Sequence, residues 1–339
     1  MLCCRAIIAN REIGPKSVPG KQDSSDAVVI LPPVRGRLRD GPLLRSLSRG
    51  QLEEVPTPLE PLAEVLREFG HERPGEGLAA LRMWGQTGDR PGAWVAAADP
   101  VYMEPRLDRL FLHVLGPDDV SKTELRRLFD GLQDTLGKDG ALGFALLGNC
   151  GYIRSEHPMV TAQVPAACLD GENPQGAMPP AESAAGTLNL VSEIEMTLHS
   201  QPVNAERLSR GKPPVNSLWI WGGGVAPEHG ATRVPPLFAD EPLLRGYWES
   251  VGGRHESWPG SAGACLDATS GGFVGVIPSG RAQAPELEAE LLTLCDALRS
   301  GRLGRMVLIS ADGVRLTLGR FDRLRFWRRV ARALEAPSA

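Results

Sequence analysis

Several features of familiar protein classes are missing from this sequence. No apolar run approaches the ~18 residues that a membrane-spanning helix requires, and the apolar stretch at residues 6–9 is too short for the core of a signal peptide. Basic residues are not in excess, because 37 lysines and arginines stand against 41 acidic residues. Proteins that bind nucleic acids usually carry a basic surplus. We therefore expect a cytoplasmic protein that binds neither membranes nor nucleic acids.

The motifs of common metal sites, cofactor sites and active sites are missing as well. The six cysteines contain no CxxC pair, so the sequence predicts free thiols and neither a zinc knuckle nor a dithiol redox centre. No HExxH, G-x-S-x-G or P-loop motif is present. Glu195 and His199 lie four residues apart on a predicted helix, but without a second pair of ligands this spacing favours a hydrogen bond on the helix surface. We expect no catalytic residues, no metal and no cofactor.

The hydrophobic pattern that is present alternates between strands and helices. Residues 27–31 form a continuous apolar run closed by Pro32 and Pro33, which is typical of a buried strand. Ser121 and Glu124 form a capping box that opens a helix. The alternation predicts an α/β fold with a mostly parallel sheet flanked by helices. Further strands are expected near residues 93–98, 107–115, 141–147, 218–221, 272–277, 306–309 and 314–318, and helices near residues 58–69, 121–136, 188–199, 286–299 and 323–334.

Two stretches carry no periodic pattern. Residues 1–26 are polar and contain two glycines and two prolines, which predicts a flexible N-terminal tail. Residues 169–187 are rich in proline, glycine and polar residues, which predicts a surface loop.

The segment from His199 to Gly224 concentrates residues that suit an anion. Arginine presents a planar fork of donors to phosphate or carboxylate oxygens, and consecutive glycine amides after a strand can form a concave anion nest. The same residues also suit a structural role, in which the asparagines cap turns and the glycines let two backbones pass closely. The candidate anion-binding residues are Asn204, Arg207, Arg210, Asn216, Gly222, Gly223 and Gly224.

This segment, HSQPVNAERLSRGKPPVNSLWIWGGG, resembles a signature of the RpfE-type regulatory protein family of proteobacteria. That family is itself similar to the archaeal-type cofactor-independent phosphoglycerate mutases of the alkaline-phosphatase superfamily. Weaker similarities are Ala98-Asp99-Pro100-Val101 and the ending at residues 304–329. The resemblance implies a single phosphomutase-like α/β domain over residues 27–339, with a segment inserted at about residues 90–225.

The sequence departs from the pattern that this resemblance implies. Gln201 stands where the family signature has histidine. The two-metal site of the superfamily needs an early aspartate, a serine or threonine nucleophile, a D-x-x-x-H pair and a D-H pair, and neither pair occurs here. We therefore expect a catalytically degenerate relative that acts as a regulatory or binding protein. Its expected partner is an anionic small molecule, phosphorylated or carboxylated, or another protein.

Two alternative functions stay open at this point. One is an active metal-dependent phosphomutase or phosphatase with atypical ligands. The other is a pure protein-interaction module that uses the Trp-rich region or the basic helix predicted at residues 323–334. The simpler expectation for the Trp-rich region is that its side chains pack in the core; they are Trp219, Trp221, Trp248 and Trp258.

Overall fold

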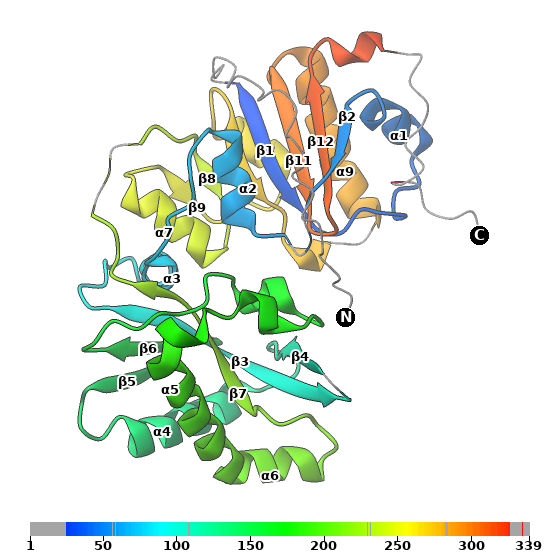
Figure 1. Cartoon of the computed structure of the whole chain (residues 1–339). Helices are drawn as coiled ribbons and strands as arrows, with labels where there is room; N and C mark the ends of the chain where they lie inside the picture. The colour runs from blue at the N-terminus through cyan, green and yellow to red at the C-terminus, as the bar shows by residue number, and fades with distance from the viewer. Residues whose placement is uncertain are drawn as a thin grey trace, which may run out of the picture.

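The computed structural model describes residues 25–325, except residues 56, 58, 108, 229, 231, 282 and 283, together with residue 334. Within this part of the chain, two β-sheets lie one above the other, with helices around and between them (Figure 1). The first sheet has the strand order β2-β12-β11-β1-β10-β8-β9. Its strands are β1 (Asp26–Leu31), β2 (Gln51–Glu54), β8 (Leu237–Phe238), β9 (His255–Glu256), β10 (Phe273–Val276), β11 (Arg305–Ser310) and β12 (Val314–Gly319).

The second sheet comes from the middle of the chain. Its strand order is β4-β3-β6-β5. Strands β4 and β6 pair with different halves of the long strand β3, and β7 pairs with β3 along the edge opposite to both. The strands are β3 (Val95–Arg106), β4 (Arg109–Val114), β5 (Leu142–Leu147), β6 (Cys150–Ser155) and β7 (Ser217–Gly224).

The expectation of a mostly parallel sheet is wrong for the molecule as a whole. The neighbouring strands β11, β1, β10, β8 and β9 of the first sheet do pair in parallel. Every strand pairing of the second sheet is antiparallel. The first four residues of β3 are buried on both faces, so they form the continuous apolar run that is usual in parallel sheets. Such a run reports burial and does not report strand direction.

The helices form three layers around the two sheets. One layer covers the outer face of the first sheet, a second lies between the sheets, and a third covers the far face of the second sheet (Figure 1). The outer layer on the first sheet consists of α1 (Gly41–Leu47), α8 (Ala262–Asp267) and α9 (Ala284–Ser300). The layer between the sheets consists of α2 (Pro61–Glu68), α3 (Leu78–Thr87) and α7 (Pro242–Ser250). The layer on the far face of the second sheet consists of α4 (Lys122–Leu136), α5 (Ala181–Ser200) and α6 (Pro202–Ser209). Short 3₁₀ turns are η1 (Ala166–Leu169), η2 (Pro174–Ala177), η3 (Ser279–Arg281) and η4 (Asp322–Leu324).

Alternating side chains of the strands supply these layers with their apolar contacts. In β1, Val28 and Ile30 face the layer between the sheets, and Ala27 and Val29 face α9 and its neighbours. The layer between the sheets also receives Trp221 from β7 of the second sheet. A single buried cluster therefore contacts both sheets, and α2, α3 and α7 are packed on two sides.

Helices α3 and α7 cross at a pair of glycines. A β-carbon on Gly246 would overlap the carbonyl oxygen of Leu81, and one on Gly85 would overlap the carbonyl oxygen of Pro242. The two helix backbones can approach this closely only because both crossing positions lack a side chain.

Several predicted elements differ at their boundaries. Strand β1 begins at Asp26, and α5 begins at Ala181, inside the stretch predicted as a loop. Gly222–Gly224 belong to strand β7 and are not a turn after it. The capping box at Ser121 is confirmed. The tail at residues 1–24 and most of the helix predicted at residues 323–334 lie outside the described residues.

Among the described helices, none combines the length and the apolar character needed to cross a lipid bilayer.

Candidate functional site

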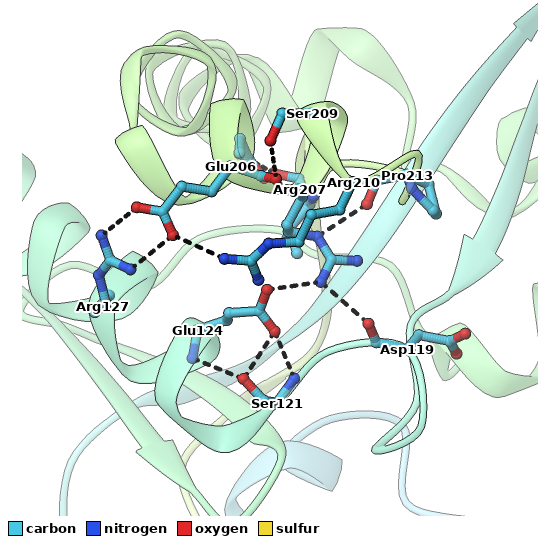
Figure 2. Close-up of polar contacts among 11 residues, drawn as sticks. Asp119, Ser121, Glu124, Arg127, Glu206, Arg207, Ser209, Arg210 and Pro213 are labelled. Carbon is cyan, nitrogen blue, oxygen red and sulfur yellow. Dashed lines mark hydrogen bonds and ion pairs between the residues drawn. The ribbon is translucent and has the colours of Figure 1, made fainter.

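Arg207 lies at the centre of a polar network that links α6 to α4 (Figure 2). Its side chain is completely buried. The Nε atom donates to the carbonyl oxygen of Pro213 (2.9 Å), and Nη1 donates to that of Asp119 (3.1 Å). Nη1 also lies 3.4 Å from Oε1 of Glu124. One guanidinium therefore joins the loop after α6, the loop before α4 and the first turn of α4.

Glu124 serves both this network and the start of its own helix. Its carboxylate accepts from the backbone N–H of Ser121 (2.9 Å), whose hydroxyl accepts from the N–H of Glu124 (3.2 Å). Burial opposes the charge of Glu124, but the hydrogen bonds from Ser121 and the nearby charge of Arg207 outweigh it, so its pKa is lowered. A charged Glu124 is the form that pairs with Arg207.

Arg210, in contrast, points towards solvent. Its side chain is 60% exposed and its Nη2 lies 3.8 Å from Glu206, which forms a two-bond ion pair with Arg127 at 3.2 Å for each bond (Figure 2). Solvent screens exposed ion pairs of this kind, so they contribute little to stability. Arg210 keeps donors that an anion in solution can reach.

The two asparagines are bonded to the backbone. The amide nitrogen of Asn204 donates to the carbonyl oxygens of Leu198 (2.8 Å) and Val215 (2.9 Å), and its side-chain oxygen accepts from the N–H of Val215 (2.9 Å). Asn216 exchanges two hydrogen bonds with the backbone of Met103 in β3, at 2.7 and 2.9 Å. Asn204 thus ties the end of α5 to the start of β7, and Asn216 extends the β3–β7 ladder.

Two of the three glycines, Gly222 and Gly224, allow β7 to pass close to the start of α3. A β-carbon on Gly224 would overlap the backbone of Gly77, and one on Gly222 would lie 2.9 Å from Cβ of Leu78. The N–H of Gly222 donates to Ala162 (2.7 Å), and that of Gly223 donates to the hydroxyl of Thr161 (2.8 Å). Both donors are used within the protein.

The structure does not gather the seven candidate residues at one place. Asn216 precedes β7 and Gly222–Gly224 end it, so roughly 20 Å of extended strand separates them. Asn204 and Arg207 lie on α6 and Arg210 directly follows it, near the Asn216 end. Anion binding by this segment stays a prediction, with Arg210 as its exposed cation.

The carboxyl ends of the parallel strands are where open α/β sheets usually bind ligands. Here the carboxylate of Asp312, in the turn after β11, accepts from the N–H groups of Val34 (2.8 Å) and Arg35 (2.7 Å) and from the hydroxyl of Ser310 (2.6 Å). Arg35 folds back onto the carbonyl oxygen of Asp312 (3.1 Å) and onto Glu54 (3.1 Å). The polar groups at this edge bond to one another.

The residues present do not fit the two-metal site that the resemblance implies. Among the described residues, no three histidine, cysteine, aspartate or glutamate side chains come together to hold a metal ion. Strand β1 leads into Pro32 and Pro33, and the nearby carboxylate of Asp312 is already engaged by two amides and a hydroxyl. No step of a reaction can be assigned to metal ions held by these side chains.

The described thiols show no sign of activation. Cys150, Cys168, Cys265 and Cys295 are free. Burial raises the pKa of Cys168 and of Cys265 to about 12, and that of Cys295 to about 11. A nucleophilic cysteine needs a lowered pKa.

A buried network around Arg82 was not recognised from the sequence. Its guanidinium bonds to Asp99 (2.7 Å), to the hydroxyl of Tyr152 (3.0 Å) and to the carbonyl oxygen of Gly151 (3.0 Å). Asp99 also accepts from the indole N–H of Trp221 (2.7 Å). Burial disfavours the charge of Arg82, but Asp99 together with Tyr152 and Cys150 outweighs this and raises its pKa. The network joins α3, β3, β6 and β7, and each of these bonds lies inside the protein.

Asp99 is one of the residues that carried the resemblance, through Ala98-Asp99-Pro100-Val101. Its partner Arg82 lies on α3, which shows no distinctive sequence motif, so no signal connected the two. Three of the four tryptophans that were considered as an interaction surface are buried, since Trp219, Trp221 and Trp248 are at most 5% exposed. The fourth, Trp258, is partly buried.

No protein-family model matches the chain. A probable 2,3-bisphosphoglycerate-independent phosphoglycerate mutase of Geobacter sulfurreducens is 27% identical over 179 residues, which are 45% of this chain and 43% of that protein. The enzyme of this type from Methanosarcina acetivorans is 33% identical over 18% of this chain and 15% of that enzyme. The one from Methanosarcina mazei is 33% identical over 19% of this chain and 16% of that enzyme.

The chain is homologous to cofactor-independent phosphoglycerate mutases. The matched segments span less than half the length of each of these three relatives. Among solved structures, a cofactor-independent phosphoglycerate mutase from Thermoplasma acidophilum aligns over 87% of this chain and 90% of its own, with 15% identity and a TM-score of 0.41. A protein from Pyrococcus horikoshii aligns over 87% of both chains, with 16% identity and a TM-score of 0.48.

Proposed function

We propose that this protein is a catalytically degenerate homologue of the cofactor-independent phosphoglycerate mutases that acts as a regulatory or binding protein in the cytoplasm. The observation that carries the proposal is the state of Asp312. It is a carboxylate at the carboxyl ends of the parallel strands, and its oxygens accept from Val34, Arg35 and Ser310. These three hydrogen bonds hold the carboxylate in a turn and compete with a metal ion for its lone pairs.

Two further observations support the proposal. The D-x-x-x-H and D-H pairs are missing from the sequence, and the described residues form no group of three metal-ligating side chains. The homology covers part of the chain and concerns ancestry, and a shared fold is not evidence of a shared reaction.

The ligand of such a binding protein stays a prediction. The sequence favoured a phosphorylated or carboxylated metabolite held between Asn204 and Gly224. Because Asn204, Arg207 and Asn216 bond mainly to the backbone, Arg210 and the neighbouring exposed Lys212 are the cations left for that role.

The proposal is tested by assaying the full chain for interconversion of 3-phosphoglycerate and 2-phosphoglycerate. The assay is run separately with manganese, magnesium, cobalt and zinc, and the mutase of Geobacter sulfurreducens serves as the matched control for each metal. We expect no turnover above the protein-free background. Turnover that a chelator abolishes would overturn the proposal in favour of an active metal-dependent phosphomutase with atypical ligands.

A further inference from the structure

A cavity of about 460 Å³ lies along the edge of β7, between α5 and the segment that contains η2. This volume falls within the ~300–1,000 Å³ usual for small-molecule sites. Two other cavities among the described residues have volumes of about 10 and 40 Å³, room for about one water molecule each. The large cavity therefore has space for an organic molecule, and these two do not.

The cavity walls are mainly apolar. Leu188 and Val191 of α5 form one side, and Met178 and Pro174 form the other. The edge of β7 forms the floor, through Leu218 and its neighbours. Apolar walls of this kind favour a ligand with an apolar body.

The floor also offers hydrogen-bonding groups. Ser217 is 1% exposed, and its hydroxyl oxygen has no hydrogen-bond partner within the described chain. Burying a hydroxyl without a partner is unfavourable, so a ligand that bonds to it is favoured. This atom is independent evidence that the floor can receive a polar group.

The backbone of Leu218 adds a donor and an acceptor. The carbonyl oxygen of Ile220 and the N–H of Gly222 both bond to Ala162, so these residues direct their polar groups away from β3. Because antiparallel pairs alternate, Leu218 directs its N–H and C=O to the same free edge. Its partner in the ladder is Pro100, which has no N–H to offer. Ala162 pairs with this edge beyond Leu218, and no other strand of the described residues covers the edge at Leu218, which lines the cavity.

The charges around the cavity select against anions. No arginine or lysine lines it, and its charged or titratable side chains are Glu195 and His199. Both are exposed, and no hydrogen bond or ion pair between them is present in the described structure. A phosphate or carboxylate would face Glu195 without a strong cation to balance it.

We propose that this cavity binds a small apolar molecule carrying one neutral group that both donates and accepts hydrogen bonds, such as a carboxamide. The apolar body lies between α5 and η2, and the neutral group pairs with Ser217 and with the backbone of Leu218 in the manner of an added strand. This site differs in chemistry from the anion site expected between Asn204 and Gly224. It does not depend on whether the chain has kept any catalytic activity.

The test is titration of the full chain with octanamide, octanoate and octylamine, followed by calorimetry. We expect octanamide to bind more tightly than octanoate, which would face Glu195, and more tightly than octylamine, whose ammonium cannot accept a hydrogen bond from the N–H of Leu218. Val191→Trp, which fills the cavity, should abolish octanamide binding. Met196→Trp, on the exposed side of the same helix, should leave it unchanged. Ser217→Ala should weaken it about two- to tenfold, the effect of one lost hydrogen bond.

Ser217→Ala removes a single atom and keeps the test usable if Val191→Trp does not fold. The inference is overturned if octanamide does not bind up to its solubility limit. It is also overturned if octanoate binds more tightly, or if folded Val191→Trp binds octanamide as the wild type does.

Discussion

Arg207 connects three segments through one fully buried side chain. Removing one partner of a buried ion pair usually costs about 3–5 kcal/mol. We expect Arg207→Ala to lower the free energy of unfolding by about 3 kcal/mol or more, because it also leaves the carbonyl oxygens of Pro213 and Asp119 without their donor. Arg210→Ala, three residues further along the chain and 60% exposed, should change it by less than about 0.5 kcal/mol. Urea denaturation of both variants gives the comparison.

Equal losses in the two variants would show that the network in Figure 2 contributes little to stability.

The same proteins test the predicted anion site. Inorganic phosphate or 3-phosphoglycerate should raise the melting temperature of the wild type, and Arg210→Ala should reduce that rise, if the exposed cations of α6 bind an anion. No rise at millimolar concentration would reject anion binding by this segment.

Glu241 provides a prediction about pH. Its side chain accepts from the N–H of Leu244 at the start of α7 (2.7 Å), and burial raises its pKa above the usual value near 4.5. As pH rises past 4.5, the carboxyl of Glu241 loses its proton in the unfolded chain but keeps it in the folded protein. The contribution of Glu241 to stability therefore falls as pH rises. Glu241→Gln keeps the acceptor and does not titrate.

We therefore expect Glu241→Gln to gain stability relative to the wild type as pH rises from about 4.5 towards neutrality. Thermal unfolding of both proteins across this range measures the difference. A difference that stays constant with pH would mean that the carboxyl of Glu241 is not desolvated in the folded protein.

At the level of single residues, the sequence did not reveal the partners of the side chains between His199 and Gly224. Arg207 bonds to the backbone of Asp119, and Asn216 bonds to that of Met103, both about a hundred residues away. Backbone carbonyl and amide groups have no residue-specific signal in a sequence. A motif of arginines and asparagines therefore does not distinguish ligand binding from bonding within the protein.

The helices provide a matched pair of glycine substitutions. Gly246→Ala places a methyl group against Leu81 at the α3–α7 crossing, whereas Gly186→Ala, within α5, meets open space. Alanine is favoured over glycine inside a helix by roughly 0.5–1 kcal/mol, and overpacking costs about 1–3 kcal/mol. We expect Gly186→Ala to raise the free energy of unfolding by about 0.5–1 kcal/mol and Gly246→Ala to lower it by about 1–2 kcal/mol. Chemical denaturation checks both signs, and stabilisation by Gly246→Ala would show that the two helices can move apart at little cost.

Elements with strong local signals were predicted well. The capping box at Ser121 and the apolar run at β1 determine their own structure, and both are present. Strand β7 was predicted too short, because glycine is unfavourable in strands unless another backbone approaches closely. Here the start of α3 approaches β7 closely at Gly222 and Gly224. This contact joins segments far apart in the sequence, so the sequence alone does not show it.

At the scale of the whole molecule, the sequence predicted the class of fold but not its two sheets. The parallel strands of the first sheet are separated by helices, as the alternating pattern indicated. The antiparallel second sheet has helices on both sides, so its strands lack the alternation of polar and apolar residues that usually marks an antiparallel sheet. The division into one domain with an insertion at about residues 90–225 stays a prediction.

The central claim is that this homologue of phosphoglycerate mutases lacks a functional two-metal site. The most direct measurement is the metal content of the full chain, equilibrated with manganese or zinc, freed of loosely bound ions and analysed by mass spectrometry. We predict well below one equivalent of either metal per chain, because Asp312 is engaged by Val34, Arg35 and Ser310. One or two equivalents that survive extensive dialysis would contradict this account.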